Sequence, residues 1–346
     1  MPWKAGTPTI SLIRGLQPAG AKGRGREVLR FLSLPRPLHE LSEGELERKQ
    51  AIGTIMTFTL RYLTSELVQR GFTWLLPVVF SECTDPLWPD PCASLEKRVE
   101  VEIYGHKVRA MLSMIVHKMV ACSLAYPRLF VLSPNVRIER RDRAKTGLHA
   151  YEFTQLDFEL REATSEDVMG LVEELLCGLL RALRRQAREE LELLGRYRSL
   201  AVPEKPFSVL DREELMARYG PEWEAVLPEH ITRPTWVVNL PREFYDYEDP
   251  ETGRWDNYDL YLPGLGEVLS GARREWEYER MVAKMRRDGV REENYRVLLK
   301  LAKEGRLKPS AGAGIGIERL VAWITGAGHV AEVQPFPRVP GVVYEL

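Results

Sequence analysis

Five side chains within one short stretch have the chemistry to bind a nucleotide. Between residues 134 and 160, apolar and polar residues alternate on both sides of a charged loop, which predicts two β-strands joined by that loop. The five are Arg137, Glu139, Arg143, His149 and Phe153. The arginines can fork onto phosphate oxygens, the glutamate can accept from an exocyclic amine, the histidine can donate, and the phenylalanine offers a flat face to a purine. A solvated hairpin tip is the ordinary alternative.

The order of these residues resembles a known motif. Arg-x-Glu, a loop, and then His-x-x-Glu-Phe-Thr-Gln-Leu-Asp-x-Glu is similar to motif 2 of the class II aminoacyl-tRNA synthetases, in particular the aspartyl/asparaginyl subgroup. The segment GAGIGIERL, Gly312–Leu320, resembles motif 3 of the same class. The resemblance implies an α+β fold, an antiparallel β-sheet flanked by helices.

The resemblance also implies roles in binding ATP. Arg137 would hold the α-phosphate and the substrate carboxylate, and Glu139 would read the adenine amino group. Arg143 and His149 would meet the β- and γ-phosphates. These cations would stabilise the charge that moves onto the phosphates during adenylate formation.

The purine would lie between two side chains from different motifs. Phe153 would stack on one face, and Arg319 of motif 3 would make a cation–π contact with the other. Arg319 follows the glycine-rich GAGIG, where small residues let the backbone approach a ligand closely. By the same resemblance, Arg137, Glu267 and Arg319 are the candidate catalytic residues.

Two acids are the candidate ligands of Mg²⁺. Asp259 and Glu267 match the acids around the family's GE-I-I-G-G segment, and hard oxygen ligands suit this ion. Asp259 has the alternative role of a turn acid. Glu267 lies in an apolar stretch, where a buried carboxylate needs a partner.

Arg274 falls where the subgroup carries the arginine that grips the amino-acid side chain. An aspartate or asparagine side chain suits such a bidentate donor, which lysine does not reproduce. Gln155 and Asp157 share a strand face and would hold the α-amino group. Ser113, near a predicted helix, is a further candidate contact.

Other segments resemble a smaller group of proteins within this class. TDPLWPD, VEIYG, SMIVHKM, PREFYD and GEVLSGARREWEYE look like the archaeal asparagine synthetases related to asparaginyl-tRNA synthetase. That family implies conversion of aspartate, ATP and ammonia into asparagine, AMP and pyrophosphate through a β-aspartyl-adenylate, without tRNA. A truncated tRNA synthetase and a non-catalytic paralogue are the two alternatives. Leu148 and Ala272 depart from the arginine and serine usual at these positions of the subgroup.

Composition sets outer limits on function. The 346 residues are 44% apolar, which suffices for one large core. The formal net charge of −1 gives no global positive field for a polyanion. No apolar run reaches the ~20 residues that span a bilayer, and no leader pattern opens the chain, so we expect a cytoplasmic protein. The four cysteines lack metal-site spacing, although Cys83 and Cys92 flank a loop and could bridge.

The remaining pattern predicts the scaffold. Residues 1–41, with one weak strand candidate at 7–13, are too short for the five-stranded barrel that grips the anticodon in the subgroup. A capping box at Ser42 begins a helix to Gln69. This helix and the strand after it resemble motif 1, which implies a homodimer. We expect one catalytic domain over 42–346 with an insertion at about 196–234. The predicted helices are 108–124, 164–195, 276–287 and 292–304, and the predicted strands are 72–80, 97–104, 235–240 and 257–262.

Overall fold

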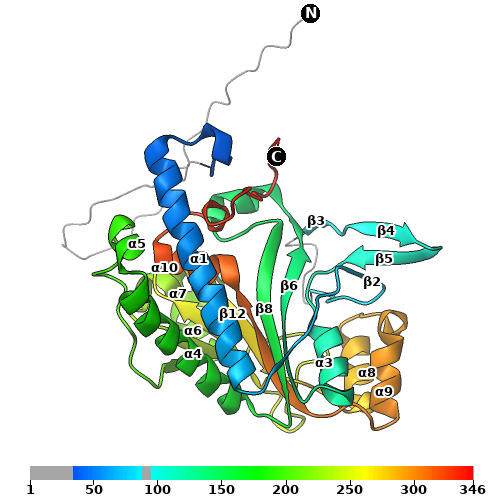
Figure 1. Cartoon of the computed structure of the whole chain (residues 1–346). Helices are drawn as coiled ribbons and strands as arrows, with labels where there is room; N and C mark the ends of the chain where they lie inside the picture. Colours follow the sequence, from blue (N-terminus) through cyan, green and yellow to red (C-terminus); the bar gives the residue numbers. More distant parts are fainter. Residues whose placement is uncertain (1–33, 88–94, 346) are drawn as a thin grey trace, which may run out of the picture. The chain divides into compact units, whose positions relative to one another are not determined.

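The computed structural model describes residues 34–87 and 95–345, which are built around an eight-stranded sheet (Figure 1). The strand order is β1-β6-β8-β13-β12-β11-β10-β9. Only the edge pairs β1/β6 and β9/β10 are parallel. The strands are β1 Thr73–Trp74, β6 Arg128–Val136, β8 Glu152–Arg161, β9 Ser208–Asp211, β10 Thr235–Val238, β11 Asn257–Leu262, β12 Gly266–Arg273 and β13 Ser310–Gly316. The expected antiparallel sheet is confirmed.

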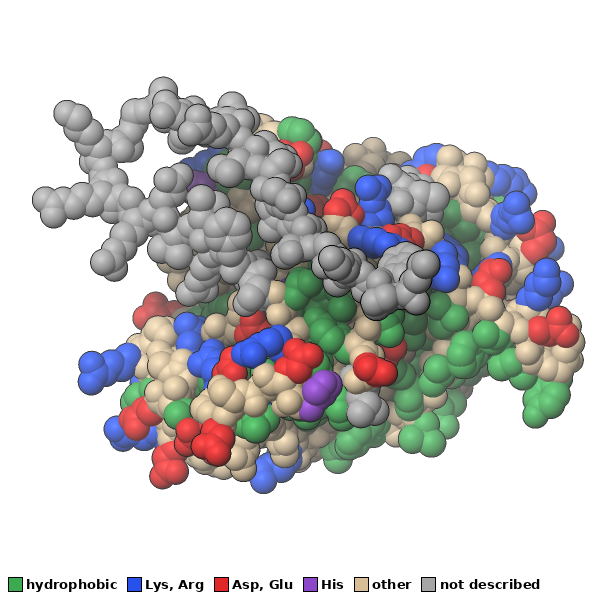
Figure 2. All heavy atoms as spheres, turned by 90° about the horizontal axis from the view of Figure 1, so that it is seen from above, with side chains coloured by type: hydrophobic (Ala, Val, Ile, Leu, Met, Phe, Trp, Pro, Cys, Tyr) green, Lys and Arg blue, Asp and Glu red, His purple; other side chains and the backbone are tan. Residues whose placement is uncertain are grey.

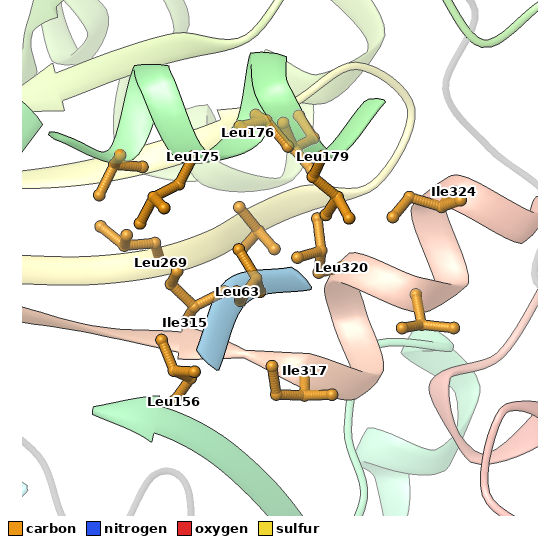
Figure 3. Close-up of a cluster of buried hydrophobic side chains, with 14 of the residues drawn as sticks. Leu63, Leu156, Leu175, Leu176, Leu179, Leu269, Ile315, Ile317, Leu320 and Ile324 are labelled. Atoms are coloured by element: carbon orange, nitrogen blue, oxygen red, sulfur yellow. The ribbon is translucent and has the colours of Figure 1, made fainter. Parts of the chain in front are cut away.

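Long helices cover one face of this sheet (Figure 1). They are α1 Glu43–Gln69, α4 Ser165–Gln186, α5 Arg188–Leu193 and α10 Ile317–Thr325. Their apolar side chains interdigitate with those of the central strands and form the main core. Figure 3 shows this contact for Leu63, Leu156, Leu175, Leu176, Leu179, Leu269, Ile315, Ile317, Leu320 and Ile324. These helices do not cover the opposite face of the sheet.

A second core lies between three further helices, α3 Ile115–Leu124, α8 Tyr278–Arg287 and α9 Arg296–Lys303. Beside it stand two small sheets, one of β2 Phe80–Ser81, β5 His106–Ala110 and β4 Glu100–Ile103, the other of β3 Leu95–Lys97 and β7 Ile138–Glu139. Helices α6 Arg212–Tyr219 and α7 Trp223–His230 pack near β9 and β10. The 3₁₀ turns are Leu38–Glu40, Arg141–Thr146, Gly220–Glu222, Glu292–Tyr295 and Val330–Glu332.

Several predicted boundaries were wrong, for tertiary reasons. The helix predicted from 108 begins only at Ile115, because β5 pairs with β4 around a turn at Tyr104 and Gly105, both with positive φ. The helix predicted over 164–195 breaks at Ala187, whose φ is −127°. The strand predicted over 72–80 is reduced to two residues at each end.

The predicted insertion contributes to the sheet, since β9 is its edge strand and pairs with β10. Residues 1–33 and Cys92 lie outside the described residues, and with them the strand candidate at 7–13 and the question of a Cys83–Cys92 bridge.

None of the described helices is long and apolar enough to cross a bilayer. On the face seen in Figure 2, acidic and basic side chains of the described residues are interspersed, in keeping with the net charge of −1.

Gly312 on β13 has no room for a side chain. A Cβ there would overlap the Phe158 carbonyl oxygen and the Glu159 carboxylate on the neighbouring strand β8. We expect Gly312→Ala to lower the free energy of unfolding by roughly 1–3 kcal/mol in urea denaturation. Gly53→Ala on α1 is the matched control, because nothing lies within 4 Å of its added Cβ. It should raise stability slightly, as alanine is the better helix former. Equal effects of the two variants would contradict the overlap.

Candidate active site

Two adjoining cavities open on the sheet face opposite the long helices, and five residues line both. The shared residues are Leu87, Arg137, Gln155, Glu267 and Gly314. The first cavity, of about 200 Å³, is lined by all seven residues predicted to bind ATP: Arg137, Glu139, Arg143, His149, Phe153, Glu267 and Arg319. The second, of about 160 Å³, is lined by all four predicted to bind the amino acid: Ser113, Gln155, Asp157 and Arg274. Residues far apart in the sequence are thus brought to one site.

Arg137 lies where the two cavities meet. Its Nε and Nη2 donate to the Leu112 carbonyl oxygen at 3.1 and 2.9 Å, and its guanidinium lies 5.2 Å from the centre of the Phe153 ring. Among the described residues, Nη1 has no acceptor. The guanidinium is therefore held in place with one edge available to a ligand.

Arg319, in the first turn of α10, is held by backbone groups. Its Nε donates to the Leu148 carbonyl oxygen at 3.2 Å, and its Nη1 donates to the Glu267 carbonyl oxygen at 2.9 Å. Nη1 also lies 3.4 Å from the Glu267 carboxylate. Because the Leu148 contact uses the backbone, it does not depend on the residue type at that position. In this structure Arg137, and not Arg319, lies over the Phe153 ring.

His149 accepts a hydrogen bond where the sequence suggested a donor. Arg143 Nη1 lies 3.2 Å from Nε2, and Nδ1 lies 2.6 Å from the Thr146 hydroxyl. That hydroxyl donates to the Arg143 carbonyl oxygen, so Nδ1 carries the imidazole proton. Burial, with Arg319 and Arg143 nearby, lowers the pKa of His149 to about 3. The neutral ring therefore orients the Arg143 guanidinium.

Glu139 is buried in the wall of the first cavity. Its Oε2 has no hydrogen-bond partner among the described residues. Burial raises the pKa of Glu139, and the charges of Arg137 and Arg143 oppose that shift. An unused buried acceptor suits the predicted contact with an adenine amino group.

The second cavity rests on a buried network of charges. Arg274 is 2% exposed, and its guanidinium pairs with Glu159 at 3.2 Å and with Asp246, and donates to the Gly312 carbonyl oxygen at 3.1 Å. Burial alone would lower the pKa of Arg274, but these two carboxylates outweigh it and raise the pKa above its usual value. All three nitrogens of its guanidinium therefore have protein partners.

Lys118 is a buried cation that was not among the site residues predicted from the sequence. It projects from α3 into the second cavity and lies 3.1 Å from Asp157 and 3.6 Å from Glu159. Its side chain is 2% exposed. A lysine inside an otherwise apolar helix face is a signal for such a role, because a buried charge needs a partner.

Comparisons with known proteins identify the family of this chain. Residues 100–340 match the family model described as tRNA synthetases class II (D, K and N). The chain belongs to this class II family. The resemblance seen in motifs 2 and 3 is thereby confirmed.

The relatives are asparagine–tRNA ligases. The chain is 35% identical over 248 residues to that of a Thermus thermophilus strain, covering 63% of this chain and 55% of the relative. It is 30% identical over 249 residues to that of Bacillus cytotoxicus, covering 64% and 53%. The chain thus spans about half the length of the curated relatives it matches.

Solved structures share the class II fold. Asparaginyl-tRNA synthetase of Pyrococcus horikoshii, complexed with asparaginyl-adenylate, aligns with a TM-score of 0.75 at 23% identity, over 86% of this chain and 70% of that one. The Entamoeba histolytica enzyme with the same adenylate aligns with a TM-score of 0.73 at 20% identity, over 84% and 67%.

Class II synthetases use ATP, typically with Mg²⁺, and the two predicted metal ligands lie near each other. Asp259 is buried on β11, pairs with Arg242, and has one carboxylate oxygen without a partner among the described residues. Burial raises the pKa of Asp259, and the negative charge of Glu267 adds to the shift. Two carboxylates suit Mg²⁺, which takes its other ligands from phosphates and water. Glu267 lines both cavities, whereas Asp259 is not among the lining residues.

Proposed function

We propose that the protein is an AMP-forming ligase that activates aspartate or asparagine as an adenylate. The observation that carries the proposal is the joining of the two cavities through Arg137, Gln155 and Glu267. A nucleotide in the first cavity would present its α-phosphate where an amino acid in the second presents a carboxylate. This is the alignment that an in-line displacement requires.

The residues of the chain would act mainly by charge and position. A carboxylate oxygen attacks the α-phosphorus, the bond to the β-phosphate oxygen breaks, and pyrophosphate leaves. Arg137 would stabilise negative charge on the α-phosphate, and Arg143 would do so on the departing phosphates. Mg²⁺ held by Glu267, with Asp259 nearby, would neutralise part of the triphosphate charge.

Two acceptors are candidates for the second step. The asparagine–tRNA ligases among the relatives favour tRNA, and they give no support to the expectation that tRNA is not used. Ammonia, which would yield asparagine from aspartate, is favoured by the acid-lined wall of the second cavity described below. Both routes share the adenylate, so the first step is the one to test first.

Several exposed apolar side chains support a homodimer, which we propose through the predicted motif 1 segment. They are Val68, Trp74, Leu76, Val79 and Phe80, in and after the C-terminal turn of α1. Leu76 is 89% exposed. Exposed apolar residues gathered in one short segment, here residues 68–80, are typical of protein interfaces.

The test of the proposed function is amino-acid-dependent exchange of pyrophosphate into ATP. We expect exchange with aspartate or asparagine and Mg²⁺, and none with glutamate, whose side chain is longer by one methylene. Exchange with either four-carbon substrate identifies which is activated. Absence of exchange with both, while ATP still binds, would overturn the proposal in favour of a non-catalytic paralogue. Adding tRNA or ammonium to the enzyme that carries the adenylate then identifies the acceptor.

A further inference from the structure

One wall of the second cavity is acidic, and only its Asp246, the partner of Arg274, belongs to the charge network of the site. Asp85 reaches it from the segment after β2, and Glu243 and Asp246 from the segment between β10 and β11. Asp246 is paired with Arg274. Asp85 accepts from the Tyr245 hydroxyl at 3.0 Å and from a backbone N–H at 2.8 Å. Two of the three carboxylates are thus held in defined positions.

Glu243 is different because its carboxylate lacks a side-chain partner. It is 8% exposed and lines the cavity, yet no side chain of the described residues donates a hydrogen bond to its carboxylate or forms an ion pair with it. The neighbouring Arg242 is paired with Asp259. Burial raises the pKa of Glu243, the charge of Asp85 adds to this shift, and the charge of Arg242 opposes it without reversing it. A buried carboxylate without a partner is costly, so a ligand that supplies positive charge would be favoured here.

The arrangement suits an ammonium group better than a metal ion. No three His, Cys, Asp or Glu side chains in the described part of the chain are grouped closely enough to hold a metal. An ammonium group needs only acceptors at ordinary hydrogen-bond distances, and carboxylates are the strongest acceptors that proteins offer it.

We propose that Glu243, with Asp85 beside it, forms a subsite for an ammonium group in the second cavity. The inference rests on the proposed function, since it concerns the molecule that joins the adenylate there. Two sources carry this group: the α-ammonium of the amino-acid substrate, and a free ammonium ion that acts as the acceptor. In the first case the subsite binds and orients the substrate.

In the second case the subsite also takes part in a covalent step. The ammonium ion gives one proton to the Glu243 carboxylate, and the nitrogen lone pair of the resulting ammonia attacks the acyl carbon of the adenylate. A carbon–nitrogen bond forms. The bond from the acyl carbon to the phosphate-linked oxygen breaks, and its electron pair leaves with AMP. The nitrogen then loses a second proton to water, which gives the neutral amide.

Glu243→Gln tests the subsite, because it removes the charge and keeps the shape. We measure amino-acid-dependent pyrophosphate exchange without ammonium, and amide formation at increasing ammonium chloride. If the source is the substrate, the KM for the amino acid in exchange should rise about tenfold or more. If it is free ammonium, exchange should be unchanged and the KM for ammonium should rise by that factor. Glu243→Asp, which keeps the charge, should fall between the two.

Glu251→Gln is the matched control, as this exposed glutamate lies in the turn after Asp249 and away from both cavities. It should leave both KM values unchanged. Melting curves show that each variant folds. The shift of the melting temperature on adding a ligand also reports binding without turnover. Ammonium chloride, compared with sodium chloride, or the amino acid should stabilise the wild type more than Glu243→Gln. Equal KM values and equal stabilisation in the wild type and Glu243→Gln would overturn the subsite. Absence of exchange in the wild type would overturn the proposed function, and the melting curves would still decide the subsite.

Discussion

Replacing Arg137 with alanine should reduce the rate of adenylate formation by roughly 100- to 1,000-fold, the usual effect of removing one preorganised donor to a developing charge. Arg137 lines both cavities, and its Nε and Nη2 are anchored on the Leu112 carbonyl oxygen. Nη1 is therefore aimed without needing to reorganise during the reaction. Pyrophosphate exchange measures the effect directly.

Arg137→Lys separates charge from geometry. Lysine keeps a positive charge but lacks the planar guanidinium, of which one edge is anchored on a carbonyl oxygen and the other faces the ligand. It should therefore recover only part of the rate. Arg140→Ala is the control, because Arg140 is exposed on the same hairpin and pairs with Asp142 at 3.3 Å. It should change the rate by less than about fivefold, as exposed ion pairs contribute little. An Arg137→Ala enzyme as active as Arg140→Ala would exclude Arg137 from the α-phosphate.

The parts of the fold set by local chemistry could be predicted from the sequence. The capping box of Ser42 and Glu45 begins α1, and Gly71, with a φ of 81°, follows its end, as the pattern indicated. The strand after the charged loop also appears where alternation placed it, as β8, whereas the segment before the loop is divided between the end of β6 and the two-residue β7, which pairs with β3 in another sheet. Each of these signals lies within a few residues of the element that it defines.

The parts set by distant partners could not be predicted. Lys118 is 39 residues from Asp157, and its place in the charge network follows from the packing of α3 against β8. The unpaired state of Glu243 depends on Arg242 turning to Asp259, 17 residues ahead. Alternation and helical spacing describe one element at a time, so they predict which side chains face a cavity but not which of them already have partners.

That distinction matters most for Arg274, where the sequence suggested a substrate contact and the structure shows a buried ion-pair network. Replacement by methionine would leave buried Asp246 without its cation, and buried Glu159 with Lys118 alone, 3.6 Å away. We expect Arg274→Met to lower the free energy of unfolding by about 3–5 kcal/mol, the range seen when one member of a buried pair is removed. Urea denaturation measures this loss.

Arg273→Met, at the adjacent position that ends β12, is the matched control. Its guanidinium lies 4.6 Å from the Tyr247 ring and 5.1 Å from the Trp276 ring, and its side chain is partly exposed. Loss of such contacts should lower stability by only about 0.5–1 kcal/mol.

Stability and substrate binding then separate the two roles of Arg274. If Arg274→Met unfolds like the wild type but raises the KM for the amino acid in exchange, the arginine serves the substrate, and Lys118 must carry the charge balance of Glu159. If stability falls as expected, any substrate that reaches Arg274 must share it with Glu159 and Asp246. A ligand carboxylate would then bind best when one of those acids is protonated or displaced.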